Sequence, residues 1–409
     1  MSIEFRPVSL DEFAEFQRAN SRAFGYHPTP IEEGAEPSYL KLFEWDRSIA
    51  ALDAGNIVAT SGIYSFEMTV PGGMLPTAGV TWVGVQATHR RRGILTGMMR
   101  RELDDIRDRG EPLAALWASE SIIYGRFGYG LSILQEDWTI ERDHTRFRYS
   151  PKVTGQMRFV ANDEGSQIAP AVWDRVRAVR PGFTNRTETW WARLYGLDPN
   201  PRPEMKDNFY VVYETAAGAD GYAIYKMGGD MVDGIPRGTV DIVELIGATD
   251  EASGALWQFC FGIDLIHTIS AHRRPLDDPL PWMLADPRRL VRKVIDAYWV
   301  RVVDVPSALS GRRYSQEGRL VFRVQDDFCP WNEGVYELEG GADSAQCRRA
   351  KGSPELALSA ADLGAIYMGG VSATALLHAG RIEQLSDGAV ERMDNMFRWS
   401  PGPWGAQGF

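Results

Sequence analysis

A run of three arginines ahead of a glycine is the part of the sequence best suited to binding an anion. It stands in the segment HRRRGIL at residues 89–95, which follows an apolar, strand-like stretch and opens a helix-like one. The start of a helix leaves backbone N–H groups without partners and carries a partial positive charge. Cations are disfavoured at that end of a helix, so three together favour an external anion over surface salt bridges. Because a glycine there lets a bulky group approach the backbone, the segment indicates a site of the kind that holds pyrophosphate.

The elements around this segment have the order of an α/β layer. Strand-like patterns cover residues 49–52, 57–68 and 79–85, and a short apolar strand is expected at 113–118. Between the last two strands a helix is expected from Gly93 to Arg109, because apolar residues recur there on one face at helical spacing. The residues of that face are Leu95, Met98, Met99, Leu103 and Ile106. Strand, helix and strand in this order indicate an α/β layer.

An internal repeat indicates that a domain has been duplicated. Residues 80–95 read VTWVGVQATHRRRGIL, and residues 240–256 read VDIVELIGATDEASGAL. With one extra residue in the second copy, Gly93 corresponds to Gly254. The alternative is a chance similarity of two strand–turn–helix units. The copies differ where chemistry is expected, since the second copy replaces the three arginines by Glu251, Ala252 and Ser253.

A third region follows the second copy, which ends in the Pro- and Asp-rich residues 275–289. We expect a hairpin there at residues 318–324 and 334–338, and a helix near residues 359–365. The last residues, 399–409, are interrupted by Pro and Gly and carry two Trp. They predict a non-helical tail that docks on the rest of the protein.

The charge balance limits the class of ligand. The chain has 409 residues, and 44 Lys and Arg against 55 Asp and Glu give a net charge of −11. This length predicts two or three domains. An acidic protein is poorly suited to nucleic acid, which needs clustered Lys and Arg, whereas it is compatible with a cationic ligand.

The remaining composition argues against disulfides, metals and membranes. The three cysteines, Cys260, Cys329 and Cys347, lack CxxC spacing, so we expect isolated thiols in a reducing compartment. The histidines show no ligand spacing, so no metal is expected. No apolar run approaches the ~18–20 residues of a membrane span, and the first residues lack a signal-peptide pattern. We therefore expect a soluble, cytoplasmic protein with no membrane partner.

The arginine segment is similar to the coenzyme A pyrophosphate loop of the GNAT acetyltransferases, Q/R-x-x-G-x-G/A. Arg90 and Gly93 fit that pattern, whereas Leu95 replaces its small last residue. The match becomes closer with LAALWASE at 113–120, IYGRFGYG at 123–130, the Trp190-Trp191 pair and the final Phe409. Together with the repeat, these stretches make the whole chain resemble the enhanced intracellular survival (Eis) acetyltransferases of actinobacteria.

The resemblance implies a fold and its division into domains. The fold class would be α/β (α+β), with two tandem GNAT-like domains followed by a sterol-carrier-like C-terminal domain. Residues 1–150 would form the catalytic GNAT domain with the acetyl-CoA site, and residues 151–295 a degenerate GNAT-like domain. Residues 296–409 would form the sterol-carrier-like domain, which donates the C-terminus to the active site. The family forms hexamers, so a homo-hexamer is expected.

The same resemblance implies roles for individual residues. The backbones of Val83 and Val85 would pair with the pantetheine arm of acetyl-CoA, and an N–H near Val83 would hold the thioester oxygen. The rest of the implied cofactor-binding set is Arg90, Arg91, Arg92, Gly93, Ile94, Leu95 and Ser119. Tyr124 would be the general acid, and the Phe409 carboxylate the base. From the residues alone, Tyr124 also fits a core tyrosine, and Phe409 a frayed terminus.

The chemistry that this implies is the attack of an amine on a thioester. A tyrosine, with a pKa of about 10, suits the reprotonation of a thiolate whose conjugate acid has a pKa of about 8.5. A terminal carboxylate, with a pKa of about 3.5, is a poor base for an alkylammonium with a pKa of about 10.4, because the gap of about 7 units corresponds to roughly 9 kcal/mol. We therefore expect the carboxylate to orient the ammonium while water removes the proton.

The expected function is acetyl-CoA-dependent N-acetylation of a primary amine that is aminoglycoside-like, a polyamine or a lysine. Trp82 would line the acceptor pocket, and Glu32 and Glu33 would attract the cationic amine. A core role for Trp82 and a merely solvated acidic loop are the alternatives. A protein lysine acetyltransferase and a non-catalytic carrier of lipid or another small ligand also stay open, although the arginine run argues against the carrier.

Overall fold

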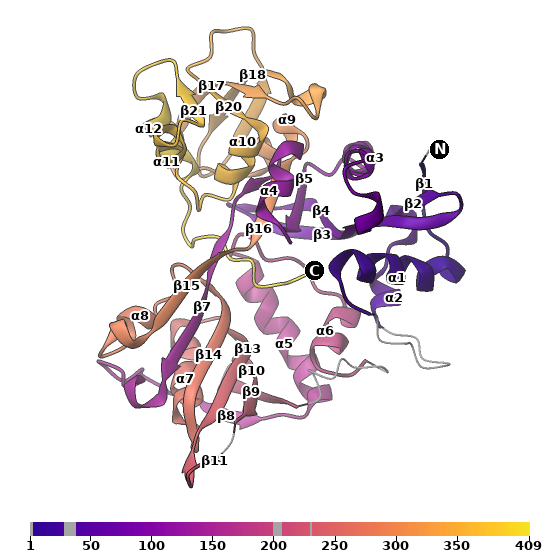
Figure 1. The fold of residues 1–409 in the computed structure, drawn as a ribbon. Helices are drawn as coiled ribbons and strands as arrows, with labels where there is room; N and C mark the ends of the chain where they lie inside the picture. Colours follow the sequence, from indigo (N-terminus) through magenta and orange to yellow (C-terminus); the bar gives the residue numbers. More distant parts are fainter. Residues whose placement is uncertain (1–2, 28–37, 199–206, 230) are drawn as a thin grey trace.

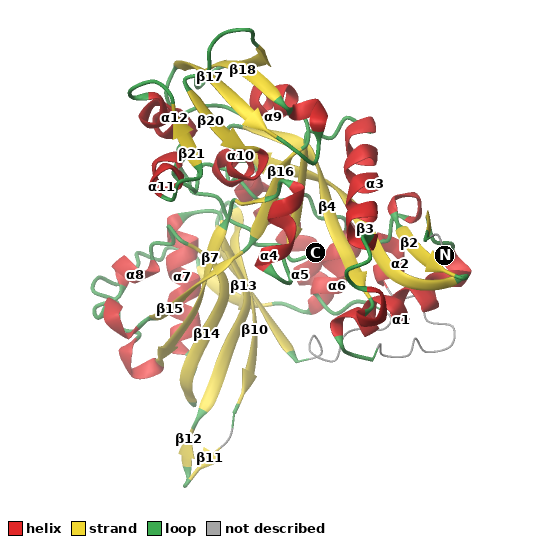
Figure 2. Cartoon of the chain, turned by 45° about the horizontal axis from the view of Figure 1, so that its top comes forward, coloured by secondary structure: helices red, strands yellow, loops and turns green. Residues whose placement is uncertain are grey.

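The computed structural model describes residues 3–27, 38–198, 207–229 and 231–409. Three sheets with their own helices occupy three lobes of the molecule (Figure 1). Two of these sheets have seven strands and the third has five, and a small hairpin projects from the second lobe (Figure 2). The chain is therefore built from three packed units, within the range of two or three domains that its length predicts.

The first sheet carries the arginine segment. Its strands, in order across the sheet, are β1 (Glu4–Arg6), β2 (Ile49–Asp53), β3 (Asn56–Val70), β4 (Gly73–Val85), β5 (Leu113–Trp117), β16 (Tyr298–Val302) and β6 (Gly130–Leu131). Helices α1 (Phe13–Phe24) and α2 (Ser38–Leu42) lie on one side of β3 and β4, and α3 (Ile94–Asp108) lies on the other (Figure 1).

Both faces of this sheet are buried because apolar side chains point alternately to each side of a strand. Leu52 of β2 packs with Phe13 and Phe16 of α1, whereas Ala51 packs with Met98 of α3. The expected helix from Gly93 to Arg109 is confirmed as α3, whose buried face includes Met98 and the other apolar residues predicted except the half-buried Leu95.

The second sheet repeats this arrangement. Its strands, in order, are β15 (Val291–Asp296), β7 (Leu134–Glu141), β14 (Ile266–Pro275), β13 (Gly238–Gly247), β10 (Gly218–Gly228), β9 (Asn208–Thr215) and β8 (Gln156–Phe159). Its helices and small hairpin are α5 (Asn162–Arg177), α6 (Glu188–Leu194), α7 (Asp250–Gly262), α8 (Leu280–Met283), β11 (Met231–Val232) and β12 (Ile235–Pro236). Tyr222 of β10 packs with Trp173 of α5, whereas Ala223 packs with Leu256 of α7, so helices again cover both faces.

The first two sheets each contain a strand from a distant part of the chain. β7 directly follows β6 in sequence, yet it pairs with β14 and β15 of the second sheet. β16 pairs with β5 and β6 of the first sheet, although it precedes the third lobe in the chain. The first two sheets therefore exchange strands across the domain boundaries expected at residues 150 and 296. The division of the chain into domains at these residues stays a proposal.

The third lobe has the expected hairpin and helix. Its strands, in order, are β19 (Ala345–Arg349), β18 (Gly334–Gly340), β17 (Gly318–Gln325), β20 (Leu356–Ser359) and β21 (Ile382–Gln384). Its helices are α9 (Val305–Gly311), α10 (Ala360–Tyr367), α11 (Ala373–His378) and α12 (Ala389–Phe397). β17 and β18 pair antiparallel, and α10 matches the predicted helical stretch. Residues 399–409 form no helix, as predicted.

The repeat is real in architecture, but one expected correspondence within it is wrong. β4 and α3 match β13 and α7 as strand–turn–helix units. Residues 86–93 separate the first pair, whereas only residues 248 and 249 separate the second. Gly93 precedes α3 as its cap, while Gly254 lies inside α7, whose cap is Thr249. The second copy therefore lacks the loop itself, and its glycine serves helix packing.

Candidate active site

A bulge in β4 separates this strand from β5. The parallel pairing of β4 with β5 ends where Val80 meets Leu116, so residues 81–85 have no partner strand on that side. On the other side, the register with β3 shifts between Thr60 and Gly62. Trp82, in the bulge, has a left-handed backbone with a φ of 56°, which is unfavourable for a bulky residue. The backbone of β4 is therefore open to pairing with another extended group.

Side chains from two elements hold the bulge in place. The Trp82 carbonyl accepts hydrogen bonds from Asn20 Nδ2 at 2.8 Å and from Thr60 Oγ1 at 2.7 Å. The Trp82 indole packs with the rings of Phe13, Phe16 and Phe43, at 6.0 to 6.2 Å between centroids. Trp82 is half-buried and packs against this aromatic cluster, which is compatible with both of its expected roles, and contact with an acceptor stays a proposal.

The loop before α3 presents backbone N–H groups to the outside. The first hydrogen bond of the helix runs from Gly97 N to Gly93 O at 3.0 Å. Among the described residues, nothing accepts from the N–H groups of residues 91–96. Residues 91–93 are exposed, and Gly93 has a φ of 78°. Since a Cβ at Gly93 would meet nothing within 4 Å, the left-handed conformation is what favours glycine there.

The three arginines, taken together in the sequence, have different roles in the structure. Arg90 donates to the carbonyls of Val85 at 3.3 Å and Ala23 at 3.1 Å, and thereby ties the loop to β4 and α1. Arg92 lies 3.3 Å from the Asp53 carboxylate. Arg91 is exposed, and no group in the described residues pairs with it. Its guanidinium is therefore the one of the three left to meet an anion.

The corresponding helix of the second copy is closed to anions. The Thr249 hydroxyl accepts from Ala252 N at 3.1 Å and so caps α7 from within. The Glu251 carboxylate at this end accepts from Thr154 N at 2.7 Å and from the Tyr213 hydroxyl at 2.5 Å. A carboxylate at the N-terminal end repels a second anion. Of the two copies, only the first has the features of a pyrophosphate site.

Tyr124 lies at the end of α4 (Ser121–Tyr124), on the face of the first sheet that α3 covers. It is 4% exposed and shares a core cluster with Val80 and Leu116, the last pair between β4 and β5. Burial raises the pKa of the Tyr124 phenol above its usual range, and the nearby Glu102 and Glu120 add to this. The phenol is therefore protonated at neutral pH and has a proton to donate.

Phe409 lies at the opposite face of the same sheet. Its ring centroid is 5.1 Å from that of Phe66 and 5.4 Å from that of Tyr298. A Cβ at Gly79 would come within 3.2 Å of the Phe409 ring. Gly79 pairs with Ala115, one step before β4 and β5 part, so Phe409 and Tyr124 flank that point from two sides.

Three segments of the chain match known domain families. Residues 4–132 and residues 182–302 each match an acetyltransferase (GNAT) domain. Residues 305–406 match a sterol carrier protein domain. The fold is therefore two tandem GNAT domains followed by a sterol-carrier-like domain, and this prediction is confirmed.

Curated relatives match over most or all of their length. An uncharacterized N-acetyltransferase of Streptomyces avermitilis is 40% identical, and the match covers 100% of both chains. The N-acetyltransferase Eis of Mycobacterium tuberculosis is 33% identical over 354 residues, which are 84% of each chain. The chain belongs to the Eis family of GNAT N-acetyltransferases. Because this family consists of enzymes, catalysis is favoured over the non-catalytic carrier.

Solved structures have the fold of this Eis-family chain from end to end. Eis1 from Mycobacterium abscessus has a TM-score of 0.85 at 29% identity and covers 100% of both chains. A GCN5-related N-acetyltransferase from Anabaena variabilis has a TM-score of 0.86 at 18% identity, again over 100% of both chains.

Two lobes of the Eis-family fold anchor the tail that carries Phe409. The Gln407 carbonyl accepts from Trp117 Nε1 at 3.1 Å and from the Tyr298 hydroxyl at 2.6 Å, both in the first sheet. The Gln407 side-chain oxygen accepts from Thr184 Oγ1 and Arg186 Nε, each at 3.0 Å, in the second GNAT domain. The tail is therefore ordered well before its last residue.

Arg186 and Glu244 form the support behind this anchor. Their side chains are 6% and 9% exposed and lie 2.7 Å apart. The Arg186 guanidinium also stacks on Trp173, at 3.4 Å from the ring centroid. Our sequence analysis missed Arg186, Glu244 and Gln407, because no local pattern relates residues so far apart in the chain.

Glu102 is a further buried group that the sequence analysis missed. It is 1% exposed on α3, and the Ser61 hydroxyl, across from the β4 bulge, donates to it. Its Oε2 atom and the Tyr129 hydroxyl have no partner among the described residues. Burial raises the pKa of Glu102 to about 8. A signal existed, since a charge between Met99 and Leu103 interrupts the apolar face of the helix.

The remaining expected site residues are placed only in part. Ser119 is exposed after β5, and Val83 and Val85 are half-buried. Glu32 and Glu33 lie outside the described residues. In the described part of the chain, no three acidic, Cys or His side chains gather around a common point, and no helix there is long and apolar enough to cross a membrane.

Proposed function

We propose that this N-acetyltransferase transfers the acetyl group of acetyl-CoA to a primary amine of an aminoglycoside-like molecule, a polyamine or a lysine. The observation that carries the proposal is the placement of Tyr124 and Phe409 on two faces of one sheet, where β4 and β5 part. Beside that point, the start of α3 offers unpaired N–H groups and the free Arg91.

The residues present fit coenzyme A. The N–H groups of residues 91–95 would hold the pyrophosphate, with Arg91 adding charge and Arg90 keeping the loop in shape. The unpaired edge of β4 at Val83 and Val85 would bind the pantetheine arm by backbone pairing. When bound, acetyl-CoA supplies the activated thioester. A role for Ser119 at this site is part of the proposal.

Tyr124 would act as the general acid. Its raised pKa keeps the phenol protonated but also makes it a weaker acid, and the same burial would raise the proton affinity of the departing thiolate. The thiolate would take the phenolic proton as the C–S bond breaks, and solvent would later restore that proton to the tyrosinate.

The Phe409 carboxylate would orient the amine. The two rings that hold Phe409, Phe66 and Tyr298, fix the end of the tail against the sheet. The gap of about 7 pKa units to an alkylammonium makes direct proton abstraction costly, so we assign the proton to water and the positioning to the carboxylate.

The acceptor remains defined by chemistry alone. A terminal carboxylate and the acidic Glu32 and Glu33 suit a cationic amine. Trp82, which Tyr64 holds through a hydrogen bond of 3.2 Å from Nε1, would border the acceptor. An aminoglycoside, a polyamine and a protein lysine all meet these terms, and substrate profiling separates them. From the family resemblance, we also propose that the protein is cytoplasmic and that it forms a homo-hexamer. Light scattering after gel filtration tests the oligomeric state.

The experiment is a measurement of thiol release from acetyl-CoA over a panel of polyamines, aminoglycosides and lysine peptides. We expect release with at least one class, together with an acetylated amine of the matching mass. Absence of release over the whole panel, with acetyl-CoA still bound, would remove the proposed acceptor class.

A further inference from the structure

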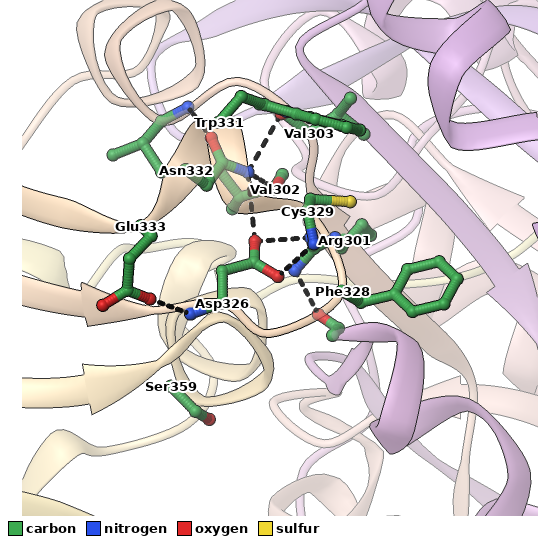
Figure 3. A network of polar contacts seen from close by, with 12 residues as sticks. Arg301, Val302, Val303, Asp326, Phe328, Cys329, Trp331, Asn332, Glu333 and Ser359 are labelled. Atoms are coloured by element: carbon green, nitrogen blue, oxygen red, sulfur yellow. Dashed lines mark hydrogen bonds and ion pairs between the residues drawn. The ribbon is translucent and has the colours of Figure 1, made fainter. Parts of the chain in front are cut away.

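A buried ion pair joins the sterol-carrier-like domain to the turn that carries Tyr124. Arg301 lies on β16, and Asp326 directly follows β17 of the third lobe. The two side chains are 0% and 1% exposed, and Arg301 donates to Asp326 Oδ2 at 2.5 Å (Figure 3). A pair of this kind is often no more stabilising than apolar residues of the same volume. The positions of its two side chains, rather than a contribution to stability, are therefore what the pair provides.

On one side, Arg301 contacts the turn that ends α4. It donates to the Gly128 carbonyl at 3.4 Å. Gly128 has a φ of 82°, and a Cβ there would come within 1.9 Å of the guanidinium. The same turn holds the Tyr124 carbonyl through a hydrogen bond of 3.3 Å from Tyr129 N. A shift of the guanidinium would thus displace the backbone that places the Tyr124 phenol.

On the other side, the loop that follows β17 holds Asp326 rigidly. Asp326 accepts from Cys329 N at 2.9 Å and from Asn332 Nδ2 at 3.3 Å (Figure 3). Its own N–H donates to the Glu333 carboxylate at 2.7 Å. Asn332 in turn donates to the Val303 carbonyl at 3.0 Å, at the end of β16.

An aromatic contact beside the ion pair strengthens this connection. The Phe328 ring, in the same loop, meets the Phe127 ring edge to face at 5.0 Å. Arg100 of α3 stacks on Phe328 at 3.9 Å from its centroid. Cys329 belongs to the same core cluster as Tyr124. The loop therefore touches the turn and α3 at once.

We propose that Arg301 and Asp326 are positioning residues for Tyr124, and that the sterol-carrier-like domain sets the general acid as well as delivering the tail. The inference rests on the proposed function in so far as Tyr124 is the acid. It gives the third domain a role in the chemistry that does not depend on binding a lipid.

The test compares Asp326→Asn, which keeps the shape and removes the charge, with Glu337→Gln as a matched control. Glu337 lies on β18 in the same lobe and pairs with Arg319 at 2.9 Å on its surface. We expect Asp326→Asn to lower kcat by roughly ten- to a hundredfold, as small displacements of a reacting group do, with little change in the KM for acetyl-CoA. The control should keep both constants.

A double-mutant cycle distinguishes positioning from general damage. In a Tyr124→Phe background, Asp326→Asn should cause no further loss, since the phenol that it positions is already absent. Full additivity of the two losses would overturn the inference. If Tyr124→Phe alone has no effect, the acid assignment of the proposed function fails instead.

Two further measurements keep the outcome decisive if Asp326→Asn is poorly folded or no acceptor is found. Phe328→Leu loosens the same contact without leaving a buried charge, and it should show the same dependence on Tyr124. Hydrogen exchange in the full chain should rise in residues 119–131 for Asp326→Asn and stay unchanged for Glu337→Gln. Unchanged exchange in these residues would contradict the inference without any assay of turnover.

Discussion

The Tyr124 side chain and the Phe409 ring lie on opposite faces of the first sheet, at the point where β4 and β5 stop pairing. They come from positions far apart in the chain, and the tail that carries Phe409 crosses the second GNAT domain before it arrives. An acyl group placed between the strands would have a proton donor on one side and a carboxylate on the other.

Removal of the phenol tests the donor. Tyr124→Phe should lower kcat by about 10²–10⁴ while the Kd for coenzyme A stays the same, because the ring still fills its place in the core. Steady-state kinetics and calorimetric titration measure the two. Tyr149→Phe, at an exposed position, is the control. A fall of less than about threefold would contradict the assignment.

Extension of the chain beyond Phe409 tests the carboxylate. A few added residues convert the terminal carboxylate into an amide and should abolish turnover, whereas coenzyme A binding should persist because its proposed site is at the start of α3. The same residues added before Met1 form the control. Normal turnover by the extended protein would take this carboxylate out of the mechanism.

The different roles of the three arginines predict different effects when each of them is substituted. Arg91→Ala should raise the KM for acetyl-CoA by roughly two- to fivefold at low salt, and by less at high salt, since an exposed charge is screened. Arg146→Ala removes another exposed charge, which lies in the second lobe, and should change nothing. We would abandon the anion-binding role of Arg91 if its effect were independent of salt.

Glu102 predicts a pH dependence of stability. Its pKa of about 8 in the folded chain lies above its ordinary value of 4.5, so its favourable contribution is complete below pH 4.5 and is lost as the pH rises through 8. The shift corresponds to a loss on the order of 5 kcal/mol. Glu102→Gln should therefore flatten the fall of Tm between pH 5 and about 9. Arg319 and Arg348 lower the pKa of Glu337, so the Glu337→Gln variant should keep the wild-type dependence of Tm on pH over this range.

The hydrogen bonds of Gln407 that anchor the tail predict a loss of amine binding and turnover without a loss of coenzyme A binding. Gln407→Ala leaves Arg186 Nε and the Thr184 hydroxyl without this acceptor and frees the last residues. We expect a higher KM for the amine and a lower kcat, each by roughly tenfold, with an unchanged Kd for coenzyme A. Ser400→Ala, an exposed change in the same tail, serves as the control. Equal weakening of coenzyme A binding would indicate general damage.

Much of the first GNAT domain could be predicted from local pattern. The helix from Ile94 to Asp108 follows from apolar spacing, and its free N–H groups follow from the geometry of any helix start. The repeat was recognisable too, but the register of Gly93 with Gly254 was wrong. Sequence similarity alone could not show that the second copy had lost its loop, because a helix interior tolerates a glycine where it packs closely.

Local sequence therefore determines the ends of the helices and the exposed arginine loop before α3, since each depends on neighbours within a few residues, whereas the role expected for Tyr124 came from the family resemblance. The contacts that bring these parts together are decided by the tertiary structure. β7 and β16 pair across the expected domain boundaries, and Gln407 finds Arg186, because partners of this kind are selected by burial and shape over long separations. The three arginines show the same division between sequence and tertiary structure. The sequence shows three adjacent charges, whereas the fold engages Arg90 and Arg92 in contacts with Ala23, Val85 and Asp53 and leaves Arg91 free.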